Sequence, residues 1–65
     1  MRIILNGEAC EIESTTLDQL LIEKDYQHPA IATALNACIV HRPKRSKTEL
    51  TEGDRVEIVA PIGGG

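Results

Sequence analysis

The chain has 65 residues, of which 42% are hydrophobic and 26% charged, and its 7 basic and 10 acidic side chains give a net charge of −3. This balance is typical of one small globular domain rather than of a disordered segment. Tyr26 is the only aromatic residue, so a chain that binds nucleic acid through base stacking is disfavoured. No stretch resembles a signal peptide or has the length of a membrane span, and we therefore expect a cytoplasmic protein that contacts no membrane.

The first predicted element is a β-hairpin. Asn6 and Gly7 separate "RIIL" from "EACEIE", and both residues of a tight hairpin turn must adopt positive φ, which Asn and Gly tolerate. Pairing Leu5 with Glu8 sets the register and places Arg2 opposite Glu11 as a cross-strand ion pair. The other face of the hairpin is predicted to enter the core, and it carries Met1, Ile3, Leu5, Cys10 and Ile12.

The segment "TLDQLLIEKD" predicts the main helix. Thr16, followed three residues later by Gln19, matches a capping box at the helix start. We expect the helix to end between residues 24 and 26, because Pro29 excludes the preceding residue from the helical region. Helical spacing gives one apolar stripe, formed by Leu17, Leu20, Leu21 and the stem of Lys24.

Two short strands, "AIATALN" and "CIV", are predicted around a turn at Asn36 and Ala37, and alternation in the first does not settle which face it buries. The basic segment "RPKRSK" predicts a solvated irregular connection that could include a helical turn near Leu50, with contact to an acidic partner as the alternative. After a turn at 51–54, "RVEIVA" predicts a final strand that ends at Pro61. Its alternation directs one set of side chains into the core, namely Val56, Ile58 and Ala60. The order of elements predicts an α+β domain, a mixed sheet of about five strands on one helix.

Groups that could catalyse a reaction are scarce. The chain has no glycine-rich phosphate loop, nucleophile elbow or paired-histidine metal motif. His28 and His41 are interpreted as surface or turn residues, and Cys10 and Cys38 as small buried hydrophobic residues. We therefore expect a protein that is not an enzyme and that binds no metal or cofactor itself.

The sequence finishes with Gly63, Gly64 and Gly65 after Pro61 and Ile62. Terminal glycines are often frayed, and an idle tail on a binding module is one interpretation. Glycine has no Cβ, however, so five residues would extend about 17 Å as a thread narrow enough for a tunnel in another protein. The group delivered is the Gly65 α-carboxylate, which is ionised at neutral pH and a poor electrophile. It would need activation by a partner that supplies the ATP site and Mg²⁺.

The stretches "RIILNGE", "TLDQLL", "ALNACIV", "EGDRVEIV" and "IGGG" together resemble the ThiS family of sulfur carrier proteins of thiamine biosynthesis, which have the ubiquitin-like β-grasp fold. The resemblance spans essentially the whole chain and implies a β-grasp domain over 1–62 with a flexible tail over 63–65. It implies that an E1-like, ThiF-like enzyme adenylates Gly65 and that a cysteine desulfurase or similar donor supplies sulfur. The resulting thiocarboxylate would serve a ThiG-like thiazole synthase. Because the sequence stops at Gly65, no processing is expected.

A docking surface for the adenylating enzyme is predicted from the side chains that face away from the helix. Ile4 and Val59 lie on strands that are parallel neighbours in a β-grasp fold, so we expect them, with Ile62, to form one exposed apolar patch. A molybdopterin-type sulfur carrier and a ubiquitin-like protein modifier remain alternatives, since both would use the same tail.

Overall fold

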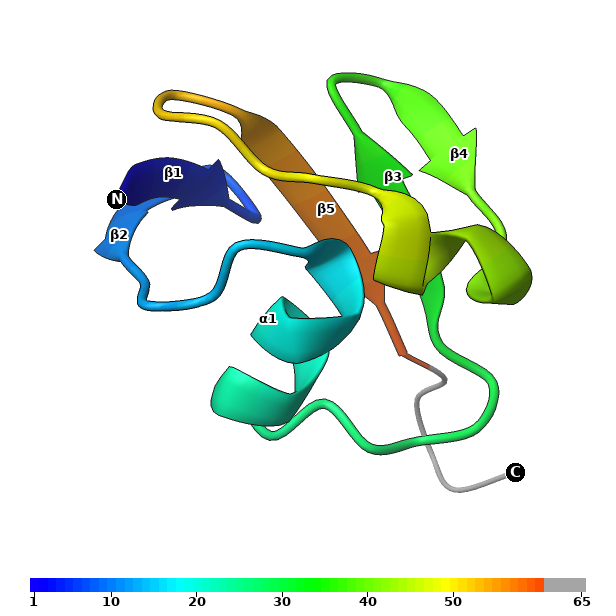
Figure 1. Cartoon of the computed structure of the whole chain (residues 1–65). Coiled ribbons are helices and arrows are strands. Elements are labelled where there is room, and N and C mark those ends of the chain that lie inside the picture. Colours follow the sequence, from blue (N-terminus) through cyan, green and yellow to red (C-terminus); the bar gives the residue numbers. More distant parts are fainter. Residues whose placement is uncertain (61–65) are drawn as a thin grey trace.

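The structure, a computed structural model that describes residues 1–60, is a five-stranded mixed sheet with one α-helix packed on one face (Figure 1). The elements in chain order are β1 (Arg2–Leu5), β2 (Glu8–Glu11), α1 (Leu17–Glu23), β3 (Ala32–Leu35), β4 (Cys38–Val40), the 3₁₀ helix η1 (Arg42–Lys47) and β5 (Arg55–Val59). The strand order is β2-β1-β5-β3-β4, so the last strand lies in the centre of the sheet. The predicted α+β architecture is confirmed.

Both hairpins turn through two residues of positive φ. Asn6 and Gly7 have φ of 50° and 85°, and the predicted register of β1 and β2 is confirmed, including the 3.2 Å ion pair between Arg2 and Glu11. Asn36 has φ of 49°, and Ala37, at 70°, occupies a conformation that costs a residue with a Cβ about 1–2 kcal/mol. This second turn pairs Leu35 with Cys38 and so settles the register that the sequence left open.

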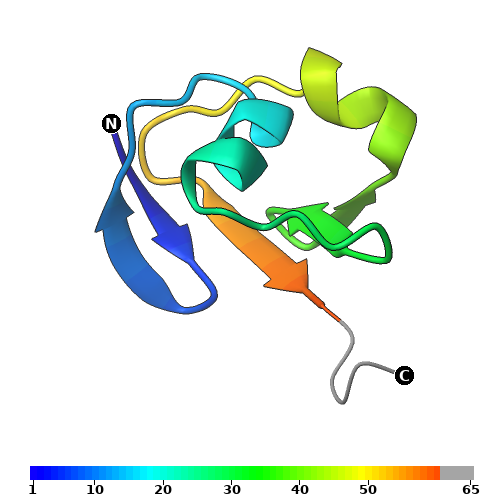
Figure 2. The same cartoon turned by 90° about the horizontal axis from the view of Figure 1, so that it is seen from below.

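The core lies between the sheet and the two helices, which Figure 2 shows on the same side of the sheet. Leu17 and Leu20 of α1 are fully buried against Ile3 and Val56. The prediction that Ala60 enters the core is wrong, because β5 ends at Val59 and Ala60 lies exposed beyond the sheet. Pro61 lies outside the described residues.

The helix begins without the predicted capping box. The Thr16 hydroxyl donates to Asp18 Oδ1 at 2.5 Å, because this charged acceptor is only two residues away, and it makes no bond to a helix amide. Gln19 Oε1 accepts instead from the backbone N–H of Thr15, at 3.2 Å. The helix ends at Glu23, with Lys24 as its C-cap, one residue before the predicted range, and Asp25 has φ of 63°, which cannot continue it.

The basic segment is the 3₁₀ helix η1, and no helical turn forms near Leu50. The prediction of a solvated loop is wrong for Arg45, which is only 8% exposed. Its guanidinium is drawn inward because it donates to Thr33 on β3 and to the carbonyl of Ile31, just before β3. The interpretation of both cysteines as buried is also wrong. Cys38 is exposed at the end of the β3–β4 turn, and Cys10 is half-buried on the edge strand β2.

A carboxylate ties the end of α1 to the segment that follows β2. Glu23 accepts hydrogen bonds from the hydroxyl of Ser14 and from the backbone N–H groups of Ser14 and Glu13. These bonds, with the Ser14 hydroxyl as the largest cause, hold the pKa of Glu23 below its ordinary value of 4.5. The loop therefore depends on the ionised form of one side chain.

Glu23→Gln tests this tie. A carboxylate whose pKa is lowered by folding stabilises the folded state above the unfolded-state pKa, and that contribution is lost as pH falls through the folded-state pKa. We expect the variant to be less stable than the parent at neutral pH, and to lose less stability than the parent on acidification, in urea unfolding followed by circular dichroism. Glu8→Gln, on an exposed strand, should follow the parent, and identical pH curves for the parent and Glu23→Gln would contradict the assignment.

Candidate functional site

The predicted reactive residue, Gly65, lies outside the described residues, as do Ile62, Gly63 and Gly64. The structure describes the strand from which this tail leaves the domain. A site can therefore be built from β5 and from the sheet face around its last residues.

Strand β5 is hydrogen bonded along both edges up to the point where the tail begins. On one side β3 runs antiparallel to it, with Ala32 opposite Val59 and Leu35 opposite Val56. On the other side the parallel pairing with β1 reaches only Leu5 opposite Val56. Beyond that point the turn residue Asn6 takes over, because its Oδ1 accepts the backbone N–H of Ile58 at 2.8 Å.

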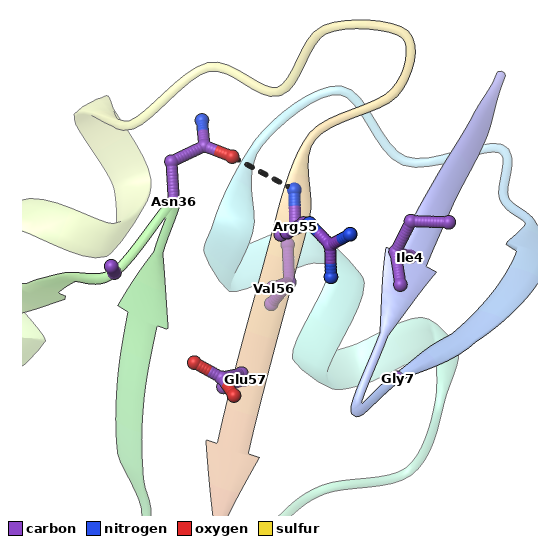
Figure 3. Close-up of a pocket in the computed structure, with 7 residues that line it drawn as sticks. Ile4, Gly7, Asn36, Arg55, Val56 and Glu57 are labelled. Atoms are coloured by element: carbon purple, nitrogen blue, oxygen red, sulfur yellow. Dashed lines mark hydrogen bonds between the residues drawn. The ribbon is translucent and has the colours of Figure 1, made fainter.

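A second turn asparagine secures the beginning of β5. Asn36 Oδ1 accepts the N–H of Arg55 at 2.9 Å (Figure 3). The side-chain amide group of Asn36 also donates to Asp54 Oδ1 at 3.1 Å. Asp54 also accepts the N–H of Thr51, and this bond is the largest cause of its lowered pKa. The base of the tail is thus a strand whose backbone is fixed at both ends by side chains from the two turns.

The sheet face opposite α1, the outer face, does not bring Ile4 and Val59 together. Ile4 lies level with Arg55, and Val59 follows four residues later, about 13 Å along the strand. The two strands are parallel neighbours as predicted, but core packing sets their offset. The expected patch of Ile4 and Val59 is therefore wrong as a contiguous surface, and its third member, Ile62, lies outside the described residues.

Val59 instead borders a different apolar group, the outer-face patch. Val59 is 66% exposed, and Ile39 on β4 is 72% exposed. The small residues of β3 lie between them, since Ala32 pairs with Val59 and Ala34 with Ile39. A hollow of about 300 Å³ is bordered by these side chains together with Thr33 and Glu57. The outer-face patch is Ala32, Ala34, Ile39 and Val59. Sequence reasoning missed Ile39, although counting outward from the Asn36–Ala37 turn would have placed it.

A second hollow of about 310 Å³ lies further along β5, beside Ile4 and the β3–β4 turn. Figure 3 shows the guanidinium of Arg55 beside Ile4, with Glu57 further along the strand. Both charged side chains are exposed, and within residues 1–60 neither has an oppositely charged group within 4 Å. The outer face is therefore mainly apolar beside Val59, where Glu57 also borders the hollow, and more charged toward Arg55.

The other candidate groups do not converge. His28 Nδ1 accepts the N–H of Ala30 at 3.0 Å, a turn contact, and His41 precedes η1. Over the described part of the chain, no three His, Cys, Asp or Glu side chains are placed to hold a metal ion, and no helix is long and apolar enough to cross a bilayer.

Comparison with known proteins decides the family, because the ThiS family model matches residues 3–65. The chain belongs to the ThiS family. The crystal structure of the thiamine biosynthesis protein ThiS from Geobacter metallireducens superposes with a TM-score of 0.82 at 26% identity, and each chain is covered completely. The resemblance and the β-grasp fold predicted from the sequence are thus confirmed.

This ThiS-family chain is also similar to parts of longer proteins. It is 38% identical over 66 residues to a thiazole synthase of Magnetococcus marinus, and 35% identical to one of Paramagnetospirillum magneticum. The chain covers 20% of each of these proteins. A protein named RnfH from Pseudoalteromonas translucida is 39% identical over 54 residues, which are 78% of this chain and 50% of that protein.

Asn6→Gly tests how the tail base is held. Glycine keeps the turn, since it tolerates positive φ, but it leaves the Ile58 N–H without its acceptor, which costs about 1–2 kcal/mol. We expect lower stability in urea and faster hydrogen exchange at the Ile58 amide. Asn6→Asp retains an acceptor oxygen and should protect that amide, so equal protection in the parent and Asn6→Gly would contradict the role of the side chain.

Proposed function

We propose that this chain is a sulfur carrier for thiazole formation in thiamine biosynthesis. In this proposal an E1-like enzyme uses ATP and Mg²⁺ to adenylate the Gly65 carboxylate, and sulfur from a cysteine desulfurase or similar donor converts it to a thiocarboxylate. A thiazole synthase then takes up the sulfur, in the cytoplasm. Membership of the ThiS family over residues 3–65 is the observation that carries the proposal.

The chemistry requires little of the carrier. A carboxylate with a pKa near 3.5 is ionised at neutral pH and resists nucleophiles. Transfer of AMP from ATP, with release of pyrophosphate, gives an acyl-adenylate, and a sulfur nucleophile can then displace AMP at the carbonyl carbon. Sulfide gives the thiocarboxylate directly, whereas a persulfide gives an acyl disulfide, whose S–S bond a thiol reductant must then cleave to leave the thiocarboxylate. The carrier supplies the carbonyl carbon and a narrow approach, while the partner supplies the nucleotide site. The described residues support this division, because their titratable side chains serve turns, ion pairs and the surface.

The thiazole synthases that resemble this chain support a link to that reaction. Each aligns with it over 66 residues, which are one fifth of its own length. A segment similar to this carrier is therefore part of the same polypeptide as the remainder of each synthase. Covalent attachment raises the effective concentration of two groups that must meet. We infer that this chain meets a thiazole synthase in the same functional relationship.

The outer-face patch is the surface we assign to the adenylating enzyme. Val59 is the last residue of β5, so a partner seated on the patch would lie at the end of the strand from which the chain continues toward Gly65. Ile39 and the two alanines extend the apolar contact sideways across β3 and β4. In this arrangement Ile4 lies at the margin of the proposed interface, because it lines the second hollow rather than the hollow of the outer-face patch.

Intact mass tests the reaction. After coexpression with an E1-like enzyme and a cysteine desulfurase, we expect a product heavier by the difference between sulfur and oxygen, with the change located at Gly65. Deletion of Gly65 should abolish it and leave urea unfolding unchanged. Expression of this chain in a bacterium that lacks its own ThiS should also restore growth without thiamine. High-mass conjugates to other proteins would support a ubiquitin-like protein modifier instead. An unaltered mass would contradict the proposal that this chain is a sulfur carrier.

Val59→Lys tests the docking surface. We expect a fall of about tenfold in kcat/KM for adenylation, measured by ATP–pyrophosphate exchange, because a charge replaces an apolar contact at the interface centre. Ile22→Lys is the matched control, since Ile22 is equally apolar and 73% exposed but lies on α1. It should leave exchange unchanged. Equal kinetics for the parent and Val59→Lys would remove the outer-face patch from the interface.

A further inference from the structure

A basic hollow lies beside the outer-face patch, at the edge of the sheet where β4 leads into η1. Its volume is about 350 Å³, and its lining includes His41, Arg42 and Arg45. No Asp or Glu is among its lining residues. It shares Ala32 and Ile39 with the hollow of the outer-face patch, so the two form one continuous surface. This local positive charge contrasts with the net charge of −3 for the chain.

Arg45 carries an ionised group that is more than nine-tenths buried but not neutralised. Its Nε donates to Thr33 Oγ1 at 3.1 Å, and its Nη2 donates to the carbonyl of Ile31 at 2.7 Å. Both acceptors are uncharged, and within residues 1–60 no carboxylate lies within 4 Å of the guanidinium. Burying a charge without a counter-charge is unfavourable, so a carboxylate brought to the guanidinium would offset part of that cost.

The groups around the Arg45 guanidinium fix its position but do not neutralise its charge. Thr33 Oγ1 donates in turn to the carbonyl of Val40 at 2.7 Å, which fixes the hydroxyl that accepts from Arg45. Arg42 donates from Nη2 to the carbonyl of Pro29 at 2.7 Å, again a neutral acceptor. Two guanidinium groups are therefore oriented in advance beside one hollow. A rigid guanidinium fork is the donor that best matches a carboxylate.

We propose that His41, Arg42 and Arg45 form a carboxylate-binding site that receives an acidic side chain of the protein docked on the outer-face patch. Charge complementarity and continuity with the apolar hollow identify the occupant as an acidic protein segment. The site would fix the orientation in which the partner docks at the end of β5. The inference rests on the proposed function for the identity of the partner, but the site itself can be measured on the isolated chain.

The first experiment titrates the ¹⁵N-labelled protein with a hexaglutamate peptide and follows NMR chemical shifts. We expect changes at the Arg45 Nε–H and at the backbone amides of His41, Arg42, Lys44 and Arg45, and binding about fivefold weaker for Arg42→Gln. Lys24→Gln, which removes an exposed cation at the end of α1, should bind as the parent does. Equal binding by the parent and Arg42→Gln, or shifts confined to the exposed lysines, would overturn the site. A response to inorganic phosphate that equals that to the peptide would overturn the assignment to a protein carboxylate.

The second experiment uses ATP–pyrophosphate exchange by the adenylating enzyme. Arg42→Glu should raise the KM for the carrier about fivefold or more at low salt and leave kcat unchanged, because the site acts in docking and not in the reaction. The same substitution should leave urea unfolding within error of the parent. A change in kcat alone would overturn the inference. If the parent chain supports no exchange at all, the proposed function fails, while the peptide titration still decides the carboxylate site.

Discussion

Two asparagine side chains complete the hydrogen bonding of β5, and the arrangement of the whole sheet depends on them. Asn6 and Asn36 each occupy the first position of a tight turn, and each reaches across to a backbone amide of the central strand, at Ile58 and Arg55. Each residue does two things, since it tolerates the positive φ of the turn and satisfies an N–H that no neighbouring strand reaches. The last strand can therefore enter the centre of the sheet between two preformed hairpins.

This construction leaves the protein with two unlike faces. The inner face of the sheet is buried in the core, because α1 and η1 cover it. A domain of this size has little volume left for an enclosed site, so we propose that function lies on the outer face and at the end of β5. The outer-face patch, with Ile39 and Val59 exposed, and the adjoining basic hollow both border that end. The proposed apolar contact and the proposed charge recognition would therefore act side by side near the last residue of β5.

Local features were predictable because their causes are local. The Asn6–Gly7 turn gave the register of the first hairpin and the Arg2–Glu11 ion pair, and leucines at helical spacing gave the buried face of α1. The capping box failed because Asp18 competed for the Thr16 hydroxyl, a choice between two nearby acceptors that spacing cannot decide. Burial of Arg45 could not be foreseen, since its acceptors lie 12 and 14 residues away in the chain.

The sequence alone determined the turns, the alternation along β1, β2 and β5, the helix and the family, because each depends on neighbouring residues or on a pattern along the whole chain. It also assigned Ile4 and Val59 to the same face of the sheet. Only the tertiary structure decided that these side chains lie four residues apart along β5 and that Val59 instead borders Ile39. Alternation specifies the face of a side chain, whereas the offset between strands distant in sequence is set by how their buried side chains pack beneath the sheet.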